Sequence, residues 1–121
     1  MATTASSARE IVERYHEAWG RQDFDTARSF LDDDLAFQGP IDTFDNADDY
    51  VAALKGLAQI VQGVEPRATV ADGDDVVVLF ELLTVKGRSR VAEWYRVRDG
   101  KIAAVDVYFD ARPFAPASTS P

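Results

Sequence analysis

The sequence contains no cysteine, which excludes disulfide bonds, thiolate metal sites and cysteine nucleophiles. Its one histidine, His16, gives little material for a multi-histidine metal site or a serine–histidine–acid triad. The G-x-G-x-x-G and Walker A patterns of nucleotide-binding proteins are absent as well. The acidic run at 32–34 is expected to be a solvated turn and not a cation site. We therefore expect a protein that works without a metal ion or a cofactor.

Basic residues are also scarce: 13 Lys and Arg stand against 21 Asp and Glu, which gives a formal charge of −8 at pH 7. Nucleic acids and anionic membranes require a basic surface on their partners, so neither is an expected partner. No apolar run approaches the ~18 residues of a membrane span, and the N-terminal stretch MATTASSARE lacks the apolar core of a signal peptide. A cytoplasmic location is the expectation.

The remaining composition is that of one globular domain. The chain has 121 residues, of which 46% are hydrophobic and 28% charged, and these are ordinary values for a packed domain. Small, polar and proline-spaced residues dominate 1–7 and 115–121, which we expect to be flexible tails. The domain is therefore predicted to cover residues 8–114.

Hydrophobic spacing predicts mostly helices in the first half of the chain and strands in the second. Ser7 is a candidate N-cap for the first helix, and Gly63 is a candidate C-cap for the third. The helices are expected at about 8–21, 25–31 and 46–62, and the strands at 35–38, 64–71, 75–85, 89–98 and 101–110. This order indicates an α+β fold in which the helices cover one face of an antiparallel sheet.

Glu93 lies in an otherwise apolar row of the strand at 89–98. A two-residue turn after that strand would set Glu93 opposite Asp106. A three-residue loop at 98–100 would instead place it on the apolar row of the last strand, with Val107. Since a one-residue slip exchanges the two faces of a strand, matching the apolar rows selects the three-residue loop. We therefore predict that Glu93 points toward the buried side of the sheet.

Glu81 is predicted to lie beside Glu93. It belongs to an apolar row of the strand at 75–85, and a three-residue loop after that strand would place it directly across from Glu93. Two acids on a shielded face cannot both ionise cheaply, and such an anomaly is typical of functional sites. The alternative is that this face is partly solvated and that Glu93 pairs with Arg88 or Arg67.

The other face of the sheet is predicted to carry a second apolar patch. With helices on one side only, this face is left to solvent or to a partner, and an exposed apolar patch usually marks association. We expect a homodimer formed through this outer face. The patch is predicted to contain Phe80, Leu82, Trp94 and Tyr108.

Several stretches, in their order and spacing, resemble one protein family. They are YHEAW at 15–19, DFDTARSFLDDDLAFQGP at 23–40, EWYRVRDGKI at 93–102 and VYFDARPF at 107–114. Over residues 8–114 the chain resembles the SnoaL-like polyketide cyclase group of the nuclear transport factor 2 superfamily, which also contains ketosteroid isomerase and limonene epoxide hydrolase. The resemblance implies a cone-shaped fold, in which three helices pack on a curved, mainly antiparallel sheet that encloses a pocket. It also implies a dimer through the outer face of the sheet.

The resemblance transfers only some of the catalytic groups of these enzymes. Ketosteroid isomerase holds an enolate oxygen with a first-helix tyrosine and a protonated strand acid, which correspond here to Tyr15 and Glu93. Its base position falls on Gly39, and an aspartate used by the epoxide hydrolase and the cyclases falls on Val107, so the epoxide hydrolase relay is not present. The remaining hypothesis is proton transfer on an apolar carbonyl compound, with Tyr15 and Glu93 stabilising the oxygen and Glu81 acting as the base.

Binding of an apolar small molecule is common to the two main alternatives. The chain is either an isomerase-like or cyclase-like enzyme, or a dimeric module that binds its ligand without transforming it. The missing base favours binding alone, whereas paired acids favour catalysis, because burying acids in a merely apolar cavity is costly. Tyr15 and Trp19 have an alternative interpretation as core residues, and His16 is expected at the edge of the helix stripe without a catalytic role. The other predicted pocket residues are Trp19, Phe37, Tyr50, Leu54, Leu79, Tyr95, Val107 and Phe109.

Overall fold

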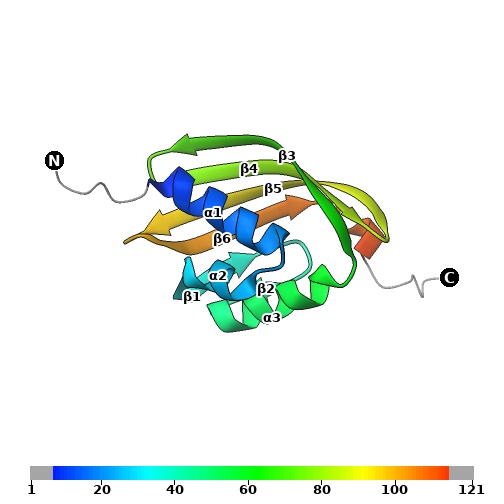
Figure 1. Cartoon of the computed structure of the whole chain (residues 1–121), viewed down its shortest axis with the longest axis horizontal. Helices are drawn as coiled ribbons and strands as arrows, with labels where there is room; N and C mark the ends of the chain where they lie inside the picture. Colours follow the sequence, from blue (N-terminus) through cyan, green and yellow to red (C-terminus); the bar gives the residue numbers. More distant parts are fainter. Residues whose placement is uncertain (1–6, 115–121) are drawn as a thin grey trace.

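The computed structural model describes residues 7–114 as an open, curved sheet of six strands with three α-helices packed on one face (Figure 1). The helices are α1 (Ala8–Gly20), α2 (Phe24–Ser29) and α3 (Ala47–Ala58). The strands are β1 (Leu31–Gln38), β2 (Thr43–Phe44), β3 (Val61–Asp72), β4 (Asp75–Thr84), β5 (Gly87–Arg98) and β6 (Lys101–Phe109), and a 3₁₀ turn, η1 (Arg112–Phe114), follows. The predicted α+β fold is confirmed. Apart from Ser7, the predicted tails lie outside the described residues.

The strand order across the sheet is β2-β1-β6-β5-β4-β3. All neighbouring pairs are antiparallel except β1 and β6, which run parallel. Helix α1 lies across β3 to β6, and α3 packs on β1 and β2, so the two long helices cover different halves of the inner face. Within residues 7–114 no helix is long and apolar enough to span a membrane.

Helix α1 begins at the N-cap expected from the sequence. The Ser7 hydroxyl accepts a hydrogen bond from the backbone N–H of Glu10 at 3.2 Å, and the Glu10 carboxylate accepts one from the N–H of Ser7 at 3.3 Å. This capping box satisfies N–H groups that the first turn of a helix leaves free. The 3.6-residue period then buries one side of the helix against the sheet. That side consists of Ala8, Ile11, Val12, Tyr15, Ala18 and Trp19.

Helix α3 ends earlier than the sequence predicts. Its last residue is Ala58, and β3 already begins at Val61, so Gly63 is a strand residue and not the predicted C-cap. A side chain at Gly63 would meet Cδ1 of Leu83 on β4 at 3.3 Å, so the close approach of the two strands accounts for glycine at this position. Strand β1 is also longer than predicted, and the two-residue strand β2 was not predicted.

The turn between β5 and β6 has two residues and not the predicted three. Asp99-Gly100 forms it, and both residues have a positive φ, 53° and 77°, as in a type I′ hairpin turn. A bulge at Arg96-Val97 then shifts the register by one residue, so Glu93 pairs with Val107. The predicted loop is wrong, but the predicted face is confirmed, because the bulge restores the match between the two apolar rows.

The register between β4 and β5 reverses the predicted faces of β4. A two-residue turn at 85–86 sets Glu93 opposite Val78 and Glu81 opposite Arg90. Glu81 therefore points away from the helices, and the predicted side-by-side carboxyl pair is wrong. The inner row of β4 consists of Val76, Val78, Phe80, Leu82 and Thr84, and the outer row of Val77, Leu79, Glu81 and Leu83.

The same reversal corrects the predicted dimer patch. Phe80 and Leu82 are buried on the inner face and cannot belong to an outer surface. Trp94 and Tyr108 do lie on the outer face, where the indole N–H of Trp94 donates to Asp75 at 2.9 Å and Tyr108 is 57% exposed. The homodimer itself stays a prediction.

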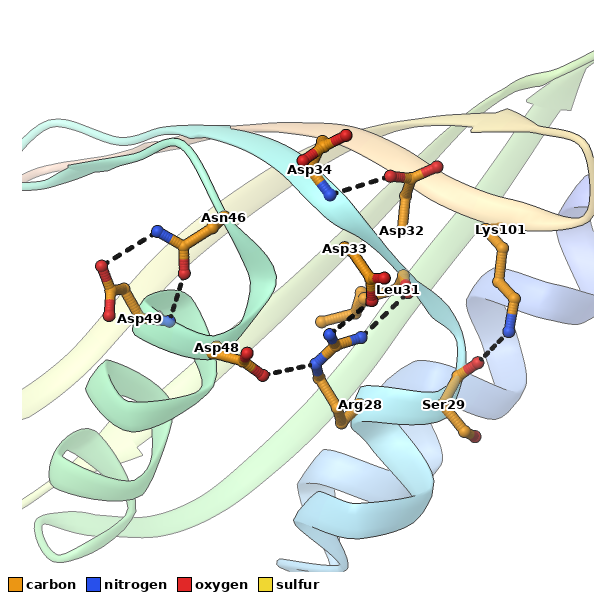
Figure 2. A network of polar contacts seen from close by, with 10 residues as sticks. All are labelled: Arg28, Ser29, Leu31, Asp32, Asp33, Asp34, Asn46, Asp48, Asp49 and Lys101. Atoms are coloured by element: carbon orange, nitrogen blue, oxygen red, sulfur yellow. Dashed lines mark hydrogen bonds and ion pairs between the residues drawn. The ribbon is translucent and has the colours of Figure 1, made fainter.

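A polar network joins α2, β1 and α3 at one end of the molecule (Figure 2). The Arg28 guanidinium on α2 donates to Asp48 of α3 at 2.9 Å and to Asp33 of β1 at 2.7 Å. The Lys101 ammonium, at the start of β6, donates to the backbone carbonyl of Ser29 at 2.6 Å. These contacts fix the short helix α2 against the sheet edge and leave the opposite end of the inner face to the apolar cavity described next.

Candidate functional site

A cavity of about 170 Å³ lies between α3, the segment around β2 and the inner face of β4, β5 and β6. Six of the predicted pocket residues line it, together with Glu93. The full lining comprises Trp19, Phe37, Gly39, Pro40, Ile41, Asp42, Phe44, Tyr50, Ala53, Leu54, Leu57, Phe80, Leu82, Ser89, Val91, Glu93, Val107 and Phe109. Because nearly all of these side chains are apolar, the cavity suits a compact apolar ligand.

One wall of the cavity is built from aromatic rings and a glycine. The ring of Phe37 on β1 stacks on Tyr50 of α3 with centroids 4.6 Å apart and lies 5.6 Å from the ring of Phe44. A Cβ at Gly39 would approach Cε1 of Phe37 to 3.1 Å, so this glycine allows the loop after β1 to close on the ring. Ile41, in the same loop, is 52% exposed and lies at the rim of the cavity. The base position that the family resemblance assigns to Gly39 is thus at the cavity, but it has no side chain.

Glu93 is the only buried charged residue among residues 7–114, and it is 7% exposed. Tyr95, two residues along β5 and therefore on the same face, donates a hydrogen bond from its hydroxyl to Oε1 of Glu93. Nε2 of His16 on α1 lies 3.3 Å from the same oxygen. Within the described part of the chain, no group donates to Oε2. Glu93 therefore lines the cavity with one carboxylate oxygen that has no donor among the described residues.

His16 belongs to this site, although the sequence interpretation placed it at a boundary. Its ring packs edge-on against Phe80 at 4.6 Å and Trp19 at 5.2 Å, and both of these rings line the cavity. Nε2 is buried, and no partner among the described residues meets hydrogen-bond geometry with it. The signal was present in the sequence, because His16 lies four residues after Val12 and three before Trp19, which places it on their side of the helix.

Three tyrosines form a buried group next to the cavity. The hydroxyls of Tyr15 and Tyr50 are 2.7 Å apart, and the rings of Tyr15 and Tyr95 pack edge-on at 5.7 Å. Burial raises the pKa of Tyr50, and the negative charge of Glu93 adds to this effect. Burial likewise raises the pKa of Tyr15 and of Tyr95, again with a smaller contribution from neighbouring groups. All three phenols are therefore protonated at neutral pH. Tyr95 donates to Glu93, and in the pair of Tyr15 and Tyr50 either hydroxyl can be the donor.

Only Tyr50 of these three lines the cavity. Tyr15 and Tyr95 are fully buried and do not line the cavity, so the prediction that Tyr95 is a lining residue is wrong. Tyr15 reaches the cavity only through the hydroxyl of Tyr50. This arrangement favours the interpretation of Tyr15 as a core residue that orients Tyr50.

Glu81 and Leu79 do not belong to the site. The Glu81 carboxylate accepts hydrogen bonds on the outer face from Arg88 at 2.7 Å and from Arg67. These hydrogen bonds, first from Arg88 and then from Arg67, lower the pKa of Glu81. Leu79 is 39% exposed on the same outer row. The predicted role of Glu81 as a base beside Glu93 is therefore wrong.

A second hollow, at the α2–β1 end, is open and polar. It contains the acidic run 32–34, which forms part of β1 and not the predicted turn. The N–H of Asp34 donates to Asp32 at 2.8 Å, and Asp33 is bound by Arg28 (Figure 2). Among the described residues, no group of three or more histidines and acids is arranged to hold a metal ion. The apolar cavity with Glu93 is therefore the candidate functional site.

The curved six-stranded sheet and its three helices define an NTF2-like fold. A structure from Cytophaga hutchinsonii ATCC 33406, described as an NTF2-like protein of unknown function, shares this fold with a TM-score of 0.82 at 21% identity, over 94% of this chain and 98% of that one. The family model of the SnoaL-like domain matches residues 12–105. The chain belongs to the SnoaL-like family.

Two further solved structures are similar to the chain. A protein from Kribbella flavida DSM 17836 is 27% identical, with a TM-score of 0.83 over 93% of this chain and 92% of that one. An LEH-like epoxide hydrolase from M. tuberculosis is 26% identical, with a TM-score of 0.72 over 86% of this chain and 83% of that one. No curated protein matches the sequence.

Proposed function

We propose that the chain binds a compact, mostly apolar small molecule in the cavity, with one polar group of that molecule against Glu93. The observation that carries the proposal is a buried carboxylate in the wall of an apolar cavity of about 170 Å³. An apolar cavity of roughly 150 Å³ is large enough for benzene, so the ligand is expected to contain a single ring or a chain of similar size.

A carboxylate in such a wall is costly unless a ligand or a neighbouring donor compensates it. Tyr95 supplies one donor to Oε1 of Glu93, and the side of the carboxylate that faces the cavity is left to the ligand. The mostly apolar walls would then provide affinity, and Glu93 would provide orientation.

Acid–base catalysis on the bound molecule is a second candidate function. It is favoured by the position of Glu93 between the cavity and His16, because carboxylates in such places act as proton acceptors. With Glu81 on the other face, Glu93 would both remove the proton next to a carbonyl group and return it elsewhere. The Tyr50 hydroxyl, at the cavity wall, would donate a hydrogen bond to the carbonyl oxygen. The similar epoxide hydrolase from M. tuberculosis supports small-molecule chemistry in this fold.

Binding is tested by an NMR titration of the 15N-labelled protein with a panel of six- to ten-atom ligands. Wild type should show shift changes confined to residues around the cavity. Ala53→Trp, which places an indole into the cavity from α3, should abolish them. Ala52→Trp, on the exposed side of the same helix, is the matched control and should bind as wild type does. Equal binding by both variants would exclude this cavity as the site.

Catalysis is tested by deuterium exchange from solvent into small cyclic ketones. Wild type should accelerate exchange by about 10²-fold or more over Glu93→Gln, the range typical of general acid–base catalysis. Glu81→Gln on the outer face is the control and should keep the wild-type rate. Equal rates for wild type and Glu93→Gln would refute catalysis while leaving the binding function intact.

A further inference from the structure

His16 and Glu93 meet in the interior without a satisfied hydrogen bond between them. Nε2 of His16 is buried and lies 3.3 Å from Oε1 of Glu93, yet no acceptor among the described residues has good hydrogen-bond geometry with it. The ring is held in place by Phe80 and Trp19, at 4.6 Å and 5.2 Å. A buried polar atom of this kind requires an explanation, since leaving it unpaired is unfavourable.

Beside an ionised Glu93, the imidazole carries a proton on Nε2. Without it, the nitrogen lone pair would face the carboxylate oxygen at 3.3 Å, and two acceptors would repel each other in a poorly solvated place. With it, an N–H···O hydrogen bond to Oε1 would form once the N–H is aligned with that oxygen. The Tyr95 hydroxyl already donates to this oxygen. Oε1 would then accept two hydrogen bonds from the protein and Oε2 none.

We propose, on the basis of the ligand-binding function above, that His16 is a positioning residue that holds Glu93 together with Tyr95, and that the ligand is a neutral molecule with one hydroxyl hydrogen. The two donors fix Oε1 and turn Oε2 toward the cavity as an acceptor. An alcohol, a phenol or an enol supplies the hydrogen that this oxygen lacks. A ketone of the same size offers only an acceptor, and a carboxylate adds a second negative charge next to Glu93.

Three ligands with the same ring separate these classes: cyclohexanol, cyclohexanone and cyclohexanecarboxylate. We expect cyclohexanol to bind wild type at least about tenfold more tightly than cyclohexanone, since a hydrogen bond to a charged group has that effect or a larger one. The carboxylate should not bind. The readout is the Kd of each ligand from NMR titration, together with the ratio of the first two.

Variants of His16 test the positioning role. His16→Leu removes the donor, so the Kd of cyclohexanone divided by that of cyclohexanol should fall toward one. His16→Gln can place an amide N–H near the position of Nε2, and it should restore the preference. A side chain that merely fills space would change stability in both variants without separating the alcohol from the ketone. Thermal unfolding of each variant records this structural effect independently.

The one histidine of the chain also allows a test on the unmutated protein. A long-range 1H–15N spectrum should show a single imidazole whose Nε2 carries a proton, and an unprotonated Nε2 would overturn the assignment even if His16→Leu does not fold. Equal Kd values for cyclohexanol and cyclohexanone, or an unchanged ratio in His16→Leu, would overturn the inference and leave the binding function standing. Failure of all three ligands to bind would overturn the inference, and failure of the wider ligand panel as well would overturn both proposals.

Discussion

Glu81 and Glu93 lie on neighbouring strands of one sheet, but their surroundings are opposite. Glu81, on the outer face, is neutralised by Arg67 and Arg88, which reach it from both adjacent strands. Glu93, on the inner face, has neutral Tyr95 as its hydrogen-bond donor and His16 within 3.3 Å. The difference shows that an outer carboxylate is held by cations that remain in water, whereas the inner one depends on a buried neutral donor.

The two glutamates also differ in what they leave available to a ligand. The ion pairs of Glu81 satisfy both of its oxygens and leave nothing for a ligand. Both contacts of Glu93 are made by Oε1, and the residue lines a cavity. The inner glutamate therefore has unused hydrogen-bonding capacity in an enclosed place, which is the property expected of a binding site.

Reversing the charge of Glu93 and of Glu81 should give the largest difference in stability between the two faces of the sheet. Glu93→Lys would place an uncompensated ammonium group in the interior, and we expect a loss of about 3 kcal/mol or more in the free energy of unfolding. Glu81→Lys lies on the outer face beneath two half-exposed arginines that can move into water, so it should cause a much smaller loss, although it brings a third cation near Arg67 and Arg88. Urea unfolding followed by tryptophan fluorescence measures both. Similar losses for the two variants would contradict the burial of Glu93.

Removing one tyrosine hydroxyl on each face of the sheet should give an intermediate difference in stability. Tyr95→Phe deletes the donor to Oε1 of the buried Glu93 carboxylate, and it should cost about 2 kcal/mol of stability, the range for hydrogen bonds to charged groups. Tyr108→Phe, at a 57% exposed position on the outer face, should change stability by less than about 0.5 kcal/mol. The midpoints of urea unfolding, compared at equal m-values, measure both changes in stability. A Tyr95→Phe variant as stable as wild type would show that Glu93 does not depend on this donor.

The smallest effect is the pH dependence of the outer ion pairs. Because hydrogen bonds from Arg88 and Arg67 lower the pKa of Glu81 in the folded state, its contribution to stability is present above the ordinary value of 4.5 and is lost as the pH falls through the lowered value. Wild type should therefore melt slightly above Glu81→Gln at pH 7, and the two should converge in acid, once the pH has fallen through that lowered value. Added salt should reduce the difference at pH 7. A difference that persists unchanged in acid would exclude the ion pairs as its cause.

The sequence predicts the face of β5 but not that of β4, for a physical reason. In β5, polar residues such as Arg90 and Arg96 alternate with apolar ones, so only one row can be buried. In β4, the run VVVLFELLT is apolar on both rows, and either row could pack against the helices. The two-residue turn at 85–86, which pairs Thr84 with Gly87, decides between them.

The sequence by itself determined the three helices, the long strands and the inward direction of Glu93, because these follow from local periodicity and from the contrast between polar and apolar rows. The order and spacing of its motifs indicated the family. Only the tertiary structure decided that Glu81 lies outside, that the hydroxyl of Tyr15 meets that of Tyr50, and that His16 reaches Glu93. These contacts depend on strand register and on how α1 lies across the sheet. Both are set by turns, a bulge and packing between segments far apart in the chain, and no local pattern encodes them.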